Sequence, residues 1–242
     1  MLFSNAIFSQ NKTIVPKSGS IVFIKEEKVL DKDLYLKSYK ELMPKMKEAI
    51  AKEVLYERLI DGKKTDTIQL KEVAEKFAKN FELMLQFIVE QEKEEIKFHH
   101  EFNGDTINKY FSKNGEIYKE TTLNKITGIE TNEFNEYVEN EEDEIIKLTE
   151  FKNETKLING FNCYKVIYNY KEQKVSDFDF LSEVTTNIRE LWVTEKIKCN
   201  FHPVINEKEI LDKYYPLEIL EYSEEIKGFE TNYKLDLITI KP

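Results

Sequence analysis

The sequence predicts an α+β protein, in which a curved antiparallel β-sheet or incompletely closed barrel carries a two-helix insertion covering one face. Two observations predict this class. Helical periodicity is confined to about residues 34–90, whereas residues 96–240 consist of short apolar segments separated by turn residues. One further strand, residues 20–25, precedes the helices. Many strands combined with one sequence-local pair of helices are typical of the α+β class.

The helical region contains two amphipathic segments, which we expect to pack on each other and on the sheet. Pro44 either kinks the first segment or marks its first turn. Gly62 ends this segment, and Asp66 or Thr67 is the expected N-cap of the second. The apolar positions recur every three or four residues; they are Tyr39, Leu42, Met43, Met46, Ile50 and Val54 in the first segment, and Leu70, Val73, Ala74, Phe77, Phe81, Met84, Leu85 and Ile88 in the second.

The remaining segments predict a meander of short strands. The strand at residues 20–25 is apolar on both sides, so we expect it to be central or covered. Asn-Gly pairs at residues 103–104 and 114–115 predict hairpin turns because both residue types tolerate a positive φ. The predicted later strands are residues 96–102, 106–111, 117–123, one near Tyr137, 145–151, 156–157, 161–170, 188–194, 217–222 and 233–240.

Length and composition predict one domain, residues 10–242. The chain has 242 residues and is 40% hydrophobic, with 16 Phe and 13 Tyr, which is enough for a substantial core. Its net charge of −10 disfavours binding to nucleic acid or to anionic lipid surfaces. No apolar run approaches the roughly 20 residues that a membrane span needs, so none is expected.

The first nine residues predict export. They are uncharged and mostly apolar, and the composition turns polar at Gln10. This pattern is typical of the remnant of a signal peptide, with Gln10 as the first mature residue. The predicted location is the periplasm, the extracellular space or the cell envelope. The alternative is a short cytosolic terminus that is disordered or forms a strand.

Catalytic motifs are missing from the sequence, so we predict no enzyme activity, no cofactor and no metal site. It contains no HExxH, CxxC or GxSxG motif, and its seven glycines are too scattered for a phosphate loop. His99 and His100 lie in a predicted strand, so they should point to opposite faces and cannot bind one metal from the same side. The acidic run at residues 139–150 lacks the spacing of an EF-hand.

The two cysteines predict a disulfide. If the strands at residues 161–170 and 188–194 pair so that Tyr170 faces Trp192, then Cys163 lies opposite Cys199. A bond between them suits an exported protein. The alternative is a pair of buried thiols.

The C-terminal third carries a family pattern between Thr155 and Tyr222. An Asn-Gly turn and a strand with a cysteine precede a Glu-x-Trp-x-Thr strand and a Pro-Leu element; the matching positions are Gly160, Cys163, Glu190, Trp192, Thr194, Pro216 and Leu217. In this order the segment resembles the GLPGLI family of exported Bacteroidetes proteins, although its Pro-Leu element lacks both glycines. The resemblance implies export and a fold similar to periplasmic lipoprotein carriers, in which an open barrel holds a lipid chain under a helical lid. The family has no established activity.

These observations predict a non-catalytic carrier or binding module for a hydrophobic ligand, such as a lipid. The apolar face of the second helix, including Leu70, should pack on the concave side of the sheet near Trp192 and leave any ligand site at that junction. The expected lining residues are Phe77, Phe81, Met84, Ile88, Tyr164, Tyr168 and Trp192. The same aromatic residues also suit a packed core. The alternative function is therefore a structural or protein-interaction module of the envelope, with a filled core and another envelope protein as its partner.

Overall fold

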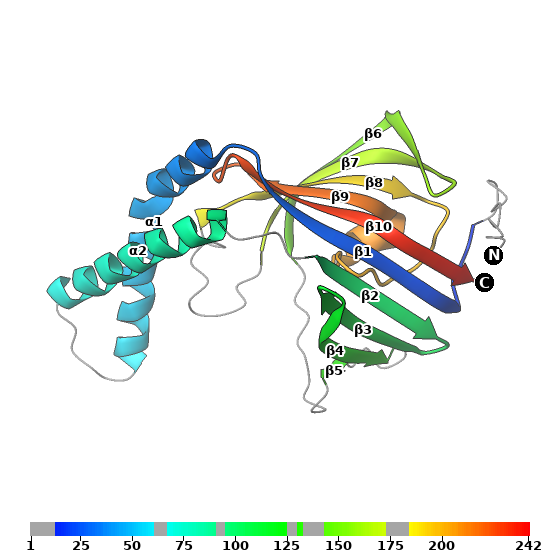
Figure 1. Ribbon diagram of the computed structural model, residues 1–242, viewed down its shortest axis with the longest axis horizontal. Coiled ribbons are helices and arrows are strands. Elements are labelled where there is room, and N and C mark those ends of the chain that lie inside the picture. The colour runs from blue at the N-terminus through cyan, green and yellow to red at the C-terminus, as the bar shows by residue number, and fades with distance from the viewer. Residues whose placement is uncertain (1–12, 61–66, 91–94, 125–129, 133–142, 173–183) are drawn as a thin grey trace.

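The computed structural model describes residues 13–60, 67–90, 95–124, 130–132, 143–172 and 184–242 (Figure 1). These residues form an α+β fold with an open, curved antiparallel sheet and a helical pair, which confirms the predicted class. Residues 1–9, Gly62, Asp66 and the strand expected near Tyr137 lie outside the described residues. The elements are β1 (Ser18–Val29), α1 (Lys32–Ile60), α2 (Thr67–Glu90), β2 (Ile96–Asn103), β3 (Thr106–Lys113), β4 (Glu116–Asn124), β5 (Glu130–Asn132), β6 (Glu144–Ile158), β7 (Phe161–Lys171), β8 (Asn187–Thr194), α4 (Lys208–Lys213), β9 (Tyr215–Ser223) and β10 (Phe229–Lys241).

The sheet has ten strands in the order β5-β4-β3-β2-β1-β10-β9-β8-β7-β6. The N-terminal strand β1 therefore pairs with both β2 and the C-terminal strand β10. Ile21, Val22 and Phe23 of β1 are at most 4% exposed, so this strand is central and covered on both sides, as its apolar sequence predicts. The predicted hairpin turns form at Gly104 and Asn114, whose φ values are 57° and 51°.

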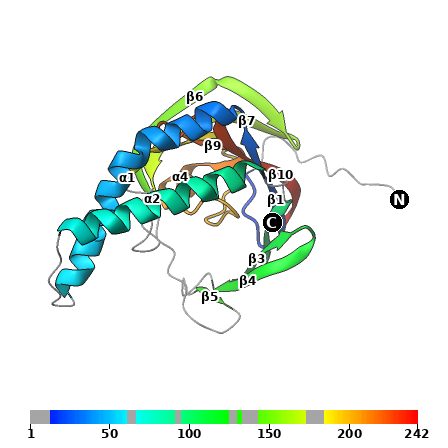
Figure 2. The same ribbon diagram turned by 60° about the vertical axis from the view of Figure 1, so that its left-hand side comes forward.

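The connection between β8 and β9, residues 195–214, folds back onto the concave side of the sheet and includes α4. We call it the plug, and Figure 2 shows α4 inside the curve of the sheet. Phe201 of the plug packs edge-on against Phe102 of β2, with ring centroids 4.9 Å apart. The apolar residues of the plug belong to the same buried cluster as the strand residues, and each is at most 8% exposed. They are Ile197, Cys199, Phe201, Ile205, Ile210 and Leu211.

The helices α1 and α2 pack against each other and project from one end of the sheet (Figure 1). Their apolar cluster meets the margin of the sheet region through partly buried residues such as Val184, Ile226 and Phe229. At the base of the pair, the backbone N–H groups of Leu30 and Asp31 donate to the carbonyl oxygen of Gly228. None of the described helices is both long enough and apolar enough to cross a membrane.

The expected contact between the apolar face of α2 and Trp192 is not formed. Trp192 packs with the core of the sheet, whereas Phe77 and Phe81 belong to the separate helical cluster. The physical reason is that the plug, which has no helical periodicity of its own in most of its length, already covers the concave side. Sequence periodicity could not reveal this competitor.

Candidate functional site

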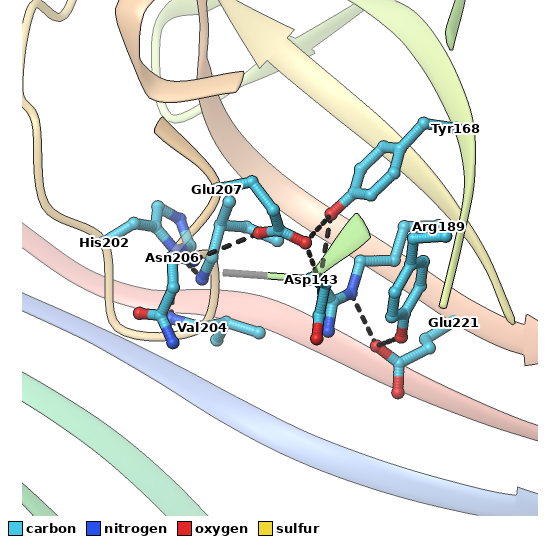
Figure 3. A network of polar contacts seen from close by, with 10 residues as sticks. Asp143, Tyr168, Arg189, His202, Val204, Asn206, Glu207 and Glu221 are labelled. Atoms are coloured by element: carbon cyan, nitrogen blue, oxygen red, sulfur yellow. Dashed lines mark hydrogen bonds and ion pairs between the residues drawn. The ribbon is translucent and has the colours of Figure 1, made fainter. Parts of the chain in front are cut away.

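A cluster of polar side chains lies on the inner face of the sheet, around Arg189 (Figure 3). Strand register assembles it: Arg189 of β8 lies opposite Tyr168 of β7 on one side and Glu221 of β9 on the other. Alternation along β8 places Arg189 on the same face as Leu191 and Val193, which are fully buried. The arginine is therefore held inside the protein by the same pattern that buries its apolar neighbours.

The guanidinium group contacts three carboxylates. Its Nε donates to Oε2 of Glu221 at 2.7 Å, and its Nη1 donates to Oε1 of Glu207 at 2.5 Å. Nη1 also lies 3.2 Å from Oδ2 of Asp143 and 3.0 Å from the hydroxyl oxygen of Tyr168. The Tyr168 hydroxyl in turn donates to Oε1 of Glu207 at 2.9 Å. Glu207 comes from the plug, so these bonds tie the plug to the sheet.

Burial makes these contacts strong. The side chains of Arg189 and Glu207 are 10% and 2% exposed, and a charge buried this far is tolerated only with close partners. Burial acts to lower the pKa of Arg189, but Tyr168 and the carboxylates outweigh it and hold that pKa well above its ordinary value. Burial raises the pKa of Tyr168, which stays a neutral donor.

A second tyrosine completes one side of the cluster. The hydroxyl of Tyr170 donates to Oε2 of Glu221 at 2.8 Å, and the guanidinium carbon of Arg189 lies 4.1 Å from the centroid of the Tyr170 ring. A ring face at this distance attracts a cation. Three carboxylates around one guanidinium nevertheless leave a formal excess of two negative charges, which makes the cluster unsuited to phosphate or other anions.

His202 fixes the plug beside this cluster. Its Nδ1 accepts from the backbone N–H groups of Val204 and Ile205 at 3.0 and 3.1 Å. Its Nε2 must then carry the proton, and it donates to the carbonyl oxygen of Pro216 at 3.0 Å. Burial lowers the pKa of His202 to about 3. The side chain is therefore a neutral structural element of the plug.

The predicted ligand-pocket residues are divided among three places. Tyr168 is the one that belongs to the arginine cluster. Phe77 and Phe81 stack inside the helical cluster with ring centroids 5.7 Å apart, whereas Met84 is 47% exposed. The side chain of Ile88 lies outside the described residues.

Two further pocket candidates, Tyr164 and Trp192, lie on opposite faces of the sheet. Tyr164 lies opposite the inward-facing Val193 and packs edge-on against Tyr214 of the plug with ring centroids 6.1 Å apart, whereas Trp192 lies opposite Lys165 on the convex face. The Tyr164 hydroxyl donates to Oε1 of Glu195 at 2.7 Å. The ammonium groups of Lys156 and Lys165 lie 5.4 and 5.7 Å from the centroid of the Trp192 ring. The structure therefore does not bring the predicted residues together into one apolar pocket.

The predicted register of β7 and β8, and the disulfide that depended on it, are wrong. Trp192 lies opposite Lys165, and Tyr170 lies opposite Asn187. Cys163 and Cys199 are reduced and buried; their Sγ atoms donate to backbone carbonyl oxygens at 3.6 and 3.4 Å. The reason is that β8 ends at Thr194 and the chain then turns inward as the plug. Cys199 consequently does not continue the strand.

The histidine pair points to opposite faces, as predicted. Nε2 of His99 lies 3.0 Å from Oγ of Ser112, and its ring stacks on Tyr110 with centroids 4.5 Å apart. His100 is 5% exposed and packs near Phe201 of the plug. Within the described ranges, no group of three or more His, Cys, Asp or Glu residues suits a metal ion.

Our sequence analysis missed Arg189, Glu207, Glu221 and Asp143. One signal was present: the chain contains two arginines, and Arg189 alternates with the apolar residues Leu191 and Val193 in a predicted strand. A charge at a core position requires buried partners.

Comparison of the chain with protein-family models, curated proteins and solved structures finds no match. The description of the site therefore rests on its geometry alone.

Proposed function

We propose that this protein is a non-catalytic protein-interaction module with a filled core. The observation that carries the proposal is the plug. Its apolar residues form one cluster with the inner face of the sheet, where a carrier of this architecture would hold an acyl chain. The buried bonds between Arg189 and Glu207 hold the plug in that position. These features support the interaction module over the hydrophobic-ligand carrier.

The exposed side chains and the charge of the helical pair favour a protein as the binding partner. Among its described side chains, six large apolar ones are between 37% and 62% exposed, namely Leu34, Leu55, Tyr56, Val73, Leu83 and Met84. Leu83 and Met84 are neighbours in α2 and both are exposed, and adjoining exposed apolar side chains are typical of protein contacts. With ten basic and nine acidic residues, the two helices lack the acidic excess of the rest of the chain, which has 26 basic and 37 acidic residues. Repulsion of other acidic proteins is therefore weakest here.

A fatty-acid probe tests the filled core. We expect a fluorescent long-chain fatty acid not to bind the intact protein, with a known fatty-acid-binding protein as the positive control. Saturable binding of one probe per chain would overturn the proposal and restore the carrier.

Photo-crosslinking in the native cell tests the contact surface. A photoreactive residue at Met84 should give a discrete crosslinked product that the substitution Leu83→Lys abolishes. The matched control is the same reagent at Leu237 of β10, which is also 47% exposed. Equal crosslinking from the two positions would contradict a contact on the helices.

We further propose that the module acts in the periplasm or at the cell envelope, which is the location that residues 1–9 predict. Fractionation of the native cell with a compartment marker tests this part, and recovery in the cytosolic fraction would contradict it.

A further inference from the structure

One histidine ring fastens the middle of the plug, residues 199–206 (Figure 3). Nδ1 of His202 accepts hydrogen bonds from the backbone N–H groups of Val204 and Ile205 at 3.0 and 3.1 Å, and Nε2 donates to the carbonyl oxygen of Pro216 of β9 at 3.0 Å. The first two bonds fold the plug back on itself, and the third ties it to the sheet. The bonds to Nδ1 require the neutral ring, because a protonated Nδ1 has no lone pair with which to accept.

A proton on Nδ1 is incompatible with the closed plug. The side chain of His202 is 2% exposed, and its ring packs on Phe23 of β1 and Tyr215 of β9 with centroids 4.6 and 5.0 Å away. After protonation, the N–H groups of Val204 and Ile205 would face a third N–H donor inside the core. Buried donors without an acceptor cost free energy, which contact with water recovers. His202 can therefore take up this proton only if the middle of the plug leaves the sheet.

The charged groups around this ring and around its neighbour His100 oppose protonation in the closed plug. Burial lowers the pKa of His202 to about 3, and the positive charge of Arg189 of β8 lowers it further, whereas the bond to Pro216 acts in the opposite direction. Burial also holds the pKa of His100 of β2 well below its ordinary value, and Lys109 of β3 and His202 add to this effect. Both histidines are therefore neutral while the plug is closed.

Two polar atoms beside the plug gain nothing from its closure. Nδ1 of His100 and the hydroxyl of Tyr215 are buried and form no hydrogen bond with the described part of the chain. The ring of His100 lies 6.1 Å from Phe201, and the ring of Tyr215 lies 5.0 Å from His202, so both border the middle of the plug. Burial raises the pKa of Tyr215 well above its ordinary value, and Cys199 of the plug raises it further. Opening of the plug would let water satisfy both polar atoms.

The two ends of the plug are fastened by other contacts. At its start, Ile14 exchanges backbone hydrogen bonds of 2.7 and 2.8 Å with Lys196 and Lys198. At its end, Glu207 accepts from Nη1 of Arg189 at 2.5 Å, so the carboxylate of the plug is directed at the guanidinium group. Neither attachment involves a histidine. The middle can thus detach as a loop while both ends stay in place.

We propose that the middle of the plug is an acid-sensitive latch, which leaves the concave side of the sheet when His202 takes up a proton from solvent at Nδ1. The strands stay paired during this release. It uncovers Phe23 and Phe102, on which His202 and Phe201 pack at 4.6 and 4.9 Å between ring centroids. Mild acid therefore gives the protein an apolar concave surface that is covered at neutral pH. The latch does not depend on the proposed interaction function.

The two buried cysteines test the latch within one chain. Cys199 lies in the middle of the plug, whereas Cys163 of β7 lies opposite Lys156 of β6, whose ammonium group lies over Trp192 on the convex face. The variant Cys163→Ala leaves the plug thiol as the reporter, and Cys199→Ala leaves the strand thiol. The rate of reaction with dithiodipyridine, a reagent that attacks thiols in mild acid, is measured at pH 7 and pH 5 and divided by the rate for free cysteine at the same pH.

We expect the normalised rate at Cys199 to rise about 25-fold between pH 7 and pH 5, and the rate at Cys163 to stay unchanged. This rise is the shift in the opening equilibrium for one histidine whose pKa is about 3 in the closed plug and 6.5 after release. In the background of Cys163→Ala, His202→Gln should abolish the rise, whatever the rate at pH 7, because glutamine does not titrate. His99→Gln is the matched control and should retain the rise, because His99 contacts Ser112 and Tyr110 and not the plug.

A second measurement needs no substitution. The emission of Nile red, an uncharged apolar dye, should increase in the presence of the unsubstituted protein at pH 5 relative to pH 7, while the far-ultraviolet circular dichroism stays the same. Three results would overturn the proposal: an unchanged rate at Cys199, a parallel rise at both cysteines, which would indicate global unfolding, or the full rise in the His202→Gln variant.

Discussion

The sheet core and the helical pair bury their apolar residues by different means. In the sheet, the plug brings distant residues together, so that Leu191, Ile205 and Ile219 are all fully buried. The helical pair has mainly its own two faces to pack, and Leu83 and Met84 stay 60% and 47% exposed on the same helix that buries Phe81 and Leu85. A regular helical spacing of apolar residues therefore predicts a helix, but it does not ensure that every residue of the apolar face is buried by a neighbouring element.

The largest expected effect of a single substitution is in the sheet core, at Arg189. Arg189→Gln removes the cation that stabilises Glu207, whose side chain is 2% exposed, so we expect a loss of about 3–5 kcal/mol in the free energy of unfolding. Urea unfolding measures it. The control, Arg58→Gln, removes an exposed hydrogen bond to Gln69 in the helical pair and should cost under about 1 kcal/mol. Similar losses in both variants would show that the cluster does not secure the core.

Within the helical pair, substitutions at two residues of α2 should differ in their cost to stability, because one side chain is buried and the other is exposed. Phe81 is 8% exposed and packs on Tyr39 with ring centroids 5.4 Å apart, so Phe81→Ala should cost about 3 kcal/mol. Met84 is 47% exposed, and Met84→Ala should change stability by less than about 0.5 kcal/mol. Chemical denaturation of both variants tests this contrast. A large loss for Met84→Ala would mean that the exposed stripe of α2 is covered in solution.

The junction between the two regions depends on Gly228. Its φ is 79°, and a Cβ atom there would lie 2.4 Å from the carbonyl oxygen of Asp31. Gly228→Ala should therefore cost about 2–3 kcal/mol and speed amide exchange in α1. Gly104 also has a positive φ, of 57°, but no atom within 4 Å of the Cβ position, so Gly104→Ala should cost only about 1 kcal/mol. Equal costs would show that backbone strain alone, and not the contact with Asp31, matters at Gly228.

Mild acid should weaken the sheet core through His202. The pKa of His202 in the folded protein is about 3, below the ordinary value of 6.5, so the unfolded chain binds the proton first as the pH falls. The stabilising contribution of the neutral imidazole is complete above about pH 6.5 and is lost progressively as the pH falls toward 3. Between pH 7 and pH 5 we expect a loss of about 2 kcal/mol.

His100 adds a loss in the same direction because burial holds its pKa well below the ordinary value. Urea unfolding at the two pH values measures the combined change, and His202→Gln should reduce the dependence on pH. All three histidines lie outside the helical pair. Faster amide exchange in α2 than in β8 on acidification would contradict an origin in the sheet core.

The sequence by itself determined the element types. Period-two alternation in β7 and β8, the Asn-Gly turns and the apolar stripe of α2 are local signals, because each depends only on neighbouring residues and on backbone geometry. They predicted the α+β class, the central position of β1 and the opposite orientation of His99 and His100. The GLPGLI resemblance and export stay predictions.

Only the tertiary structure decided what fills the concave side, how β7 and β8 align and where the charges meet. The register depends on which face each strand buries against distant partners. The predicted alignment of β7 and β8 placed Trp192 opposite Tyr170 and implied a disulfide between Cys163 and Cys199, whereas both thiols are free. Glu207 and Glu221 reach Arg189 from positions 18 and 32 residues away in the chain. Such contacts depend on long-range burial, and a sequence pattern that repeats over a few residues carries no information about them.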